Sequence, residues 1–188
     1  SAAGAGSGCG YSTMILCEDT LLELGTPIRY YPKGSRLPAK HQLLLTFDDD
    51  SFISCTVKMW GALFCIPATA FPDDKKPSPL TDAFDERYFE QLCSASPKNL
   101  SLKALLATEQ RIPGLGNGVL QDILWNAALH PKRSLLSLND KEQLRLYQSI
   151  KETLKAMAEQ GGRDTEKDLF GKAGGYPTVC SNTALSRP

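Results

Sequence analysis

The spacing of apolar residues changes once along this chain of 188 residues, and that change limits what the chain can fold into. Up to about residue 67, apolar residues come in short runs separated by turn-forming clusters, which is typical of β-strands. From residue 82 onward they recur every three or four residues, as on one face of an α-helix. Four prolines, at positions 67, 72, 77 and 79, separate the two patterns. The sequence therefore predicts an α+β protein in which strands precede helices.

The first pattern predicts antiparallel strands joined by tight turns. Residues 18–20 and 48–51 are polar and lie between apolar runs, as the tips of β-hairpins do. The run from Asp48 to Asp50 is also a possible carboxylate cluster, but Asp is favoured in turns because it bonds to its own backbone. We therefore predict a β-sandwich-like part without a metal at this run. The expected strands are residues 13–17, 21–24, 28–31, 41–47, 52–57 and 61–66.

The second pattern predicts helices with recognisable ends. Asp82, Ser101 and Asn139 stand where N-cap side chains are expected, and Glu142 completes a capping box with Asn139. Beyond residue 163 the helical spacing fades, which predicts a loop. The expected helices are residues 82–95, 102–110, 119–128 and a long one from residue 139 that glycines 161 and 162 end.

These patterns divide the chain into three segments. Residues 1–70 are predicted to be part of a β-sandwich domain, residues 71–81 a linker, and residues 82–188 a helical domain. Basic and acidic residues number 21 each, yet the first 97 residues carry a net charge of −4 and the rest a net charge of +4. A positive module can meet phosphate groups. No apolar run approaches the ~20 residues of a membrane span, so we expect no membrane partner.

Cysteine and histidine usage argues against a zinc site within this chain. None of the six cysteines forms a Cys-x-x-Cys pair, and there are only two histidines. A structural zinc site needs four such ligands at close spacing. The first ten residues also lack the basic start and apolar centre of an export signal. We therefore expect reduced thiols, a cytoplasmic protein, and no metal or cofactor bound by this chain.

The segment with the clearest chemistry is the glycine-rich break between two predicted helices. Gly114 and Gly116 permit positive φ angles and a close backbone approach, and Asn117 offers an amide donor. The helix that follows presents unpaired N–H groups and the positive end of its dipole, which favour an anion such as a DNA phosphate. Two alternatives remain: Asn117 is a simple N-cap, or the break belongs to a helix-hairpin-helix.

A longer string of segments resembles one family of DNA repair enzymes. Gln-Arg-Ile-Pro-Gly-Leu-Gly-Asn at residues 110–117 looks like the phosphate loop of the helix–two-turn–helix (H2TH) module of the Fpg/Nei DNA glycosylases. Other segments are similar to that family in the same order, and the last pair resembles a clostridial and Bacteroides-like branch. These segments are residues 40–41, 58–61, 77–84, 123–133 and 159–162, and then 163–171 with 174–176.

The resemblance implies a base excision repair enzyme that acts on damaged double-stranded DNA. Such a glycosylase extrudes an oxidised base from the duplex and excises it. The amine of an N-terminal proline attacks the sugar and forms a Schiff base, and a neighbouring glutamate moves protons. β,δ-Elimination then cuts the strand, which makes the enzyme an AP lyase as well. The resemblance also implies a monomer associated with the bacterial nucleoid.

Both ends of the chain depart from the family pattern. The family begins with Pro-Glu, whereas this chain begins Ser1-Ala2-Ala3. The family usually ends in a four-cysteine zinc finger, and this chain ends at Pro188, about where that finger should open. We therefore expect a fragment that is inactive alone, with the catalytic Pro-Glu upstream of Ser1. Zinc is expected only in the full-length protein.

By resemblance, five further residues are assigned to DNA. Lys58 and Lys132 are expected to contact DNA, and Tyr176 is expected to lie near a backbone phosphate. Met59 and Trp60 are expected to fill the void left by the extruded base. The alternatives are that Trp60 is a core residue, Tyr176 a loop aromatic and Lys132 a cation at a helix end. For the whole protein, the alternatives are a non-enzymatic nucleic-acid-binding module with the same phosphate grip and a protein–protein scaffold.

Overall fold

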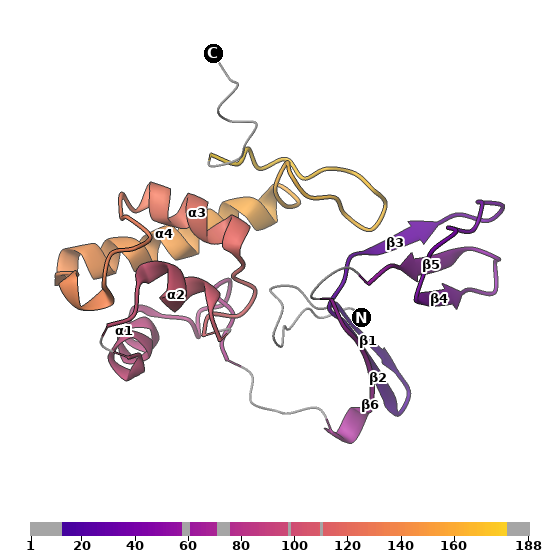
Figure 1. The fold of residues 1–188 in the computed structure, drawn as a ribbon, viewed down its shortest axis with the longest axis horizontal. Coiled ribbons are helices and arrows are strands. Elements are labelled where there is room, and N and C mark those ends of the chain that lie inside the picture. Colours follow the sequence, from indigo (N-terminus) through magenta and orange to yellow (C-terminus); the bar gives the residue numbers. More distant parts are fainter. Residues whose placement is uncertain (1–12, 58–60, 71–75, 98, 110, 180–188) are drawn as a thin grey trace, which may run out of the picture.

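The structure is a computed structural model that describes residues 13–57, 61–70, 76–97, 99–109 and 111–179. Strands fill its first part and helices its second, as Figure 1 shows, so the predicted α+β class is confirmed. The loop that follows the last helix, drawn in yellow, reaches back towards the strands. Within the described residues, no helix combines the length and apolar character needed to cross a membrane.

Among the described residues, six antiparallel strands form two sheets of three strands each. The first sheet has the order β1-β2-β6 and the second the order β3-β5-β4. The two sheets meet where the chain passes between them, because the Gly25 N–H donates to the Ala62 carbonyl at 2.8 Å and the Thr26 hydroxyl to the Thr56 carbonyl at 2.8 Å. The strands are β1 (Thr13–Cys17), β2 (Thr20–Leu24), β3 (Ile28–Tyr31), β4 (Leu43–Thr46), β5 (Phe52–Cys55) and β6 (Leu63–Pro67).

The aspartate run forms the tip of the β4–β5 hairpin. The Asp49 carboxylate accepts hydrogen bonds from the Ser51 N–H at 3.0 Å and the Ser51 hydroxyl at 2.5 Å, and these bonds lower the pKa of Asp49. Asp50 has a φ of +65° and pairs with Lys33 at 2.7 Å. β4 and β5 pair antiparallel on the two sides of this turn, which confirms the hairpin interpretation. β4 ends at Thr46, earlier than predicted, because Phe47 already bonds across the turn to Ser51.

In the part of the chain that the structure describes, four α-helices follow the strands. They are α1 (Glu86–Ala95), α2 (Leu102–Ala107), α3 (Asn117–Asn126) and α4 (Asp140–Glu159). The prediction that Asp82 caps the first helix is wrong: Asp85 is the N-cap, and its carboxylate accepts from the Tyr88 N–H at 2.7 Å. The N–H of Phe84 bonds back to Thr81 at 3.3 Å, so the chain is still in a turn where the helix was expected to begin.

The second helix stops three residues before its predicted end. Ser101 caps it as expected, accepting from the Ala104 N–H at 3.2 Å. At the other end, the Thr108 hydroxyl donates to the Ala104 carbonyl at 2.6 Å, and Arg111 donates to the same carbonyl at 3.3 Å. Glu109 then adopts a φ of +58°. Two side chains thus bond to the Ala104 carbonyl in the last turn of α2, and the chain turns away after it.

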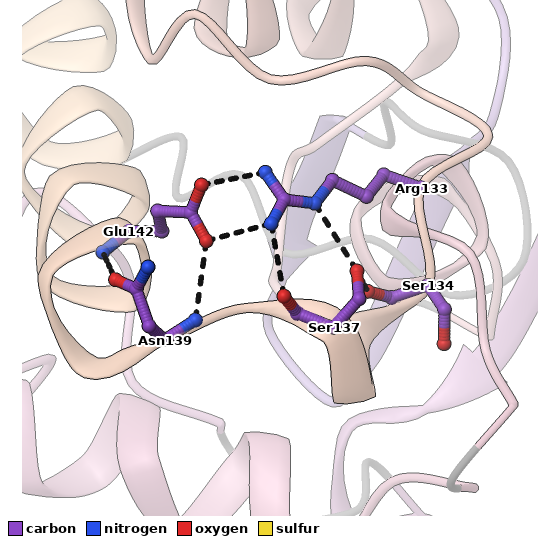
Figure 2. A network of polar contacts seen from close by, with 5 residues as sticks. All are labelled: Arg133, Ser134, Ser137, Asn139 and Glu142. Carbon is purple, nitrogen blue, oxygen red and sulfur yellow. Dashed lines mark hydrogen bonds and ion pairs between the residues drawn. The ribbon is translucent and has the colours of Figure 1, made fainter.

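The start of α4 is held by the network in Figure 2. The Asn139 side chain accepts from the Glu142 N–H at 3.0 Å, and the Glu142 carboxylate accepts from the Asn139 N–H at 3.1 Å, which confirms the predicted capping box. Arg133 adds two parallel bonds to the same carboxylate, at 2.6 and 2.7 Å, and donates to the Ser137 carbonyl at 2.9 Å. A bidentate pair of this kind is stronger than a single contact.

The network makes stability depend on pH at the acid end. Hydrogen bonds from Arg133 hold the pKa of Glu142 below its ordinary value. The stabilisation is therefore complete above the carboxyl's ordinary pKa of about 4.3 and disappears as the pH falls through the lowered value. Glu142→Gln should flatten the loss of stability on acidification, measured by urea unfolding between pH 7 and pH 3. Glu159→Gln is the control, because Glu159 forms only an exposed ion pair, with Lys155 at 3.9 Å. It should leave the dependence of stability on pH unchanged.

The four helices share one hydrophobic core. Its fully buried members include side chains from every helix and from the loop between α2 and α3, so the loop is fixed to the core. Residues packed at no more than 2% exposure are Phe84, Phe89, Leu102, Leu105, Leu106, Ile112, Leu115, Leu120, Ile123, Leu124, Ala127, Leu146 and Ile150.

The loop after α4 joins the helices to the second sheet. The Leu169 carbonyl accepts from the Tyr30 N–H of β3 at 2.9 Å, and the Phe170 ring meets the Tyr30 ring edge-on at 5.5 Å. The prediction of an irregular segment here is confirmed for residues 163–179. Its backbone is nevertheless well bonded, since the Tyr176 N–H donates to Gly162 at 3.0 Å and the Asp164 N–H to Tyr176 at 2.9 Å.

Candidate nucleic-acid interface

Two apolar side chains anchor the glycine-rich loop between α2 and α3 to the helical core. Ile112 and Leu115 are both fully buried in the helical core. Gly114, between them, is exposed and has a φ of +78°, a conformation that L-residues with a side chain rarely adopt. The loop therefore presents bare backbone to solvent while its apolar residues anchor it. Gly116 does not need this freedom, because its φ is −113°.

The first turn of α3 has N–H groups that no N-cap side chain satisfies. Gly116 is the N-cap, no side chain caps the helix, and the N–H groups of Val119 and Leu120 bond to the Gly116 carbonyl at 3.2 and 3.1 Å. The N–H groups of the two residues before them, Asn117 and Gly118, have no acceptor within the helix. Asn117 is exposed in this turn. The alternative that Asn117 is the N-cap is therefore wrong, and so is the predicted helix start at residue 119, since α3 begins at Asn117.

Asn117 also lines a cavity of about 650 Å³ beside the loop. Lys103 from the first turn of α2 lines the same cavity and adds a positive charge to it. Lys103 lies here because α2 packs against the segment after α3. The Lys103 N–H donates to the Pro131 carbonyl of that segment at 2.9 Å. No pattern in the sequence pairs Lys103 with Asn117. The other lining residues are Leu120, Gln121, Leu124, Trp125, Ala128, Leu129, His130 and Pro131.

Comparison with known proteins agrees with this geometry. The family model for the formamidopyrimidine-DNA glycosylase H2TH domain matches residues 76–168, which include the loop and α3. This chain carries the H2TH domain of the Fpg/Nei family. The resemblance to a clostridial and Bacteroides-like branch of that family stays a prediction.

Curated relatives carry the same family name. The formamidopyrimidine-DNA glycosylase of Vibrio vulnificus strain YJ016 is 39% identical over 102 residues, which are 54% of this chain and 36% of the relative. The Enterococcus faecalis protein of that name is 30% identical over 147 residues, 73% of this chain and 52% of the relative. The chain thus spans between about a third and a half of these relatives' lengths.

Solved structures share the fold across most of the chain. A Lactococcus lactis Fpg complex with DNA containing an abasic site has a TM-score of 0.73 and 22% identity, covering 91% of this chain and 66% of that one. The MutM (Fpg) protein of Thermus thermophilus has a TM-score of 0.72 at the same identity and coverage. The strands and helices described above therefore have the Fpg fold.

Tyr176 lies deeper than its expected role at a phosphate implies. The residue is 8% exposed and belongs to the helical core. Burial raises the pKa of Tyr176, and a hydrogen bond with Asn126 opposes that rise. A second cavity, of about 310 Å³, is lined by Tyr176, Asn126 and residues of α4. The predicted contact of Tyr176 with an Fpg-type DNA phosphate remains a prediction.

The remaining predicted contact residues differ in how they are placed. Lys132 is exposed after α3, and its N–H donates to His130 Nδ1 at 3.2 Å, which fixes the His130 ring in a local turn. His130 thus has a structural contact here, whereas DNA contact by Lys132 stays a prediction. Lys58, Met59 and Trp60, the expected DNA-contacting and void-filling residues, lie outside the described residues.

The described residues contain no cluster that could bind zinc, and the two buried thiols among them are unreactive. Within residues 13–179, apart from the gaps named above, no three His, Cys, Asp or Glu side chains come together to bind a metal. The zinc implied by the Fpg/Nei resemblance therefore has no ligand set there. Burial raises the pKa of Cys93 to about 12, and burial also raises the pKa of Cys55. Both thiols stay protonated at neutral pH, so neither is a candidate nucleophile.

Proposed function

We propose that this chain is the DNA-binding part of an Fpg-type glycosylase that excises oxidised bases from double-stranded DNA. The H2TH match over residues 76–168, with Asn117 exposed at the open start of α3, is the observation that carries the proposal. In this reading, the N–H groups of the α3 first turn and the Asn117 side chain bind one backbone phosphate. Gly114 lets the backbone approach that phosphate closely.

Binding of this kind positions the duplex without reading its sequence. Phosphate contacts fix register and orientation, whereas base contacts supply specificity. Lys103, in the cavity beside Asn117, adds attraction to the phosphate backbone. The interface we propose is thus a grip that holds DNA while another part of the protein acts on the base.

The chemical steps of the full-length protein are also a proposal. The amine of an N-terminal proline attacks C1′ of the damaged nucleotide, the base leaves, and a Schiff base forms between protein and sugar. β,δ-Elimination then breaks the strand, which is the AP lyase activity. We assign no described residue to these steps and expect the catalytic Pro-Glu and the zinc-binding cysteines in other parts of the full-length protein. We further propose that it acts as a monomer at the bacterial nucleoid.

Replacing Asn117 tests the phosphate grip. Because the amide bonds to a charged group, Asn117→Ala should weaken duplex binding about tenfold, whatever the DNA sequence. If the phosphate contact is lost, the slope of log affinity against log salt should become shallower by up to about 0.9. Fluorescence anisotropy of a labelled duplex between 50 and 200 mM KCl measures both quantities.

Asn139→Ala is the matched control, because it removes the same side chain at the start of another helix. It should lower the stability of α4 by about 1 kcal/mol without changing the salt slope. Wild-type affinity and slope for Asn117→Ala would overturn the proposed grip.

Borohydride trapping separates the enzyme from a simple binding module. The full-length protein, mixed with a duplex that contains an abasic site, should become covalently attached to DNA when borohydride reduces the Schiff base. A protein that binds this duplex with the expected salt dependence but is never trapped would be the non-enzymatic nucleic-acid-binding module. A protein without any salt-dependent DNA binding would be the scaffold.

A further inference from the structure

The guanidinium group of Arg163 lies directly against the first turn of α3. A Cβ atom added to Gly118 would stand 2.2 Å from Nη1 of Arg163, 2.6 Å from Nη2 and 2.7 Å from Cζ. Such distances leave no room for any side chain, so Arg163 occupies the space that a residue other than glycine would fill. Gly118 follows Asn117 directly, and Arg163 comes from the loop after α4. Tertiary folding thus brings a cation to the proposed phosphate grip.

A cation in this place is unusual on electrostatic grounds. The N-terminal end of a helix carries partial positive charge and favours anions over cations. Glu166 offsets this, because its carboxylate lies 2.5 Å from Nη2 of Arg163. The Arg163 side chain is 14% exposed, whereas that of Glu166 is 41% exposed. The anion is therefore the more accessible partner, and a phosphate that reaches α3 can take its place.

The loop holds Arg163 in position before any ligand arrives. The Asp164 N–H donates to the Tyr176 carbonyl at 2.9 Å, and the Gly175 N–H donates to the Gln160 carbonyl at 2.8 Å. The Asp164 carboxylate also bonds to the N–H and the hydroxyl of Thr178. These bonds fix the backbone on both sides of Arg163. A guanidinium held in this way loses little conformational freedom when it binds an anion.

We propose that Arg163 is a second anchor of the DNA phosphate bound at Asn117, and that Glu166 is the counterion which this phosphate displaces. The inference rests on the proposed function and deepens it. Asn117 and the helix amides are neutral, and Arg163 supplies the full positive charge at the phosphate. Because Gly118 has no side chain, the Arg163 guanidinium can lie close to the backbone amides of α3. If Arg163 served only to join the loop to α3, it would keep its ion pair with Glu166 whether or not DNA was bound.

Three variants of the full-length protein test this anchor in the same anisotropy titration on duplex DNA. Arg163→Gln should weaken binding at least tenfold and make the salt slope shallower by about 0.9, the value for one phosphate contact. Arg163→Lys should keep the slope, because it keeps the charge. Glu166→Gln should tighten binding several-fold, because it removes the competing anion. Lys155→Gln, which removes one positive charge from an exposed position of α4, should leave the slope unchanged.

The outcomes are distinct. Unchanged or weaker binding by Glu166→Gln, or a wild-type slope for Arg163→Gln, overturns the role of Arg163. If Asn117→Ala weakens binding while the Arg163 variants do not, only the second anchor fails. If neither position affects binding, the phosphate grip fails as a whole. Should Arg163→Gln unfold by circular dichroism, the Arg163→Lys and Glu166→Gln results decide.

Discussion

Replacing Phe84 by alanine is expected to lower the free energy of unfolding by about 3–5 kcal/mol, the usual cost of removing a buried phenylalanine ring. Phe84 is completely buried just before α1. Its ring lies 5.5 Å from that of Tyr88, 6.2 Å from that of Phe89 and 6.2 Å from that of Tyr147, the last in a stacked arrangement. Phe84 therefore joins α1 to α4. The cavity that Phe84→Ala would leave removes this contact between the two helices.

Urea unfolding followed by the helical circular dichroism signal measures the effect. Phe170→Ala is the matched control, because the Phe170 side chain is 70% exposed. Among the described residues, the Tyr30 ring is its one aromatic partner. It should cost less than about 1 kcal/mol, as exposed positions usually do. A cost for Phe84→Ala no larger than that of the control would show that Phe84 does not hold α1 against α4.

Replacing Gly174 by alanine is the second change with a large expected effect. A Cβ atom there would lie 2.2 Å from both the carbon and the oxygen of the Gly162 carbonyl and 2.7 Å from the Arg163 N–H nitrogen. These are backbone atoms, so no side-chain rotation relieves the overlap. The two crossing segments must separate, which breaks the bond from Tyr176 to Gly162 and exposes the Tyr176 ring. We expect a loss of about 1–3 kcal/mol, as for other overpacked sites.

The loss should be local as well as global. Hydrogen exchange of the Tyr176 N–H, which bonds to the Gly162 carbonyl at 3.0 Å, should become faster in Gly174→Ala relative to amides in the middle of α4. Gly25→Ala is the control, because its new Cβ meets no atom closer than 3.4 Å. Equal stability of the two variants would contradict the crowding described at Gly174.

Much of the secondary structure follows from neighbouring residues alone. The β4–β5 hairpin was predictable because Asp49 bonds to Ser51, two residues away, and the start of α4 because Asn139 and Glu142 cap each other across one turn. The start of α1 was not, since Asp82 and Asp85 are equally good caps by residue type. The backbone turn from Thr81 to Phe84 decides between them, and that turn depends on burying the Phe84 ring.

The phosphate loop shows the same division. The glycines and Asn117 marked this loop as a backbone-exposing break with a donor beside it, because those properties belong to the residues themselves. The sequence also determined the order of strands and helices, through the period of its apolar residues. Only the tertiary structure decided that Lys103 lines the same cavity as Asn117, that Arg163 lies against Gly118 and that Tyr176 lies in the core. Those placements depend on packing between segments far apart in the chain, which periodicity and capping signals, limited to a few neighbouring residues, do not encode.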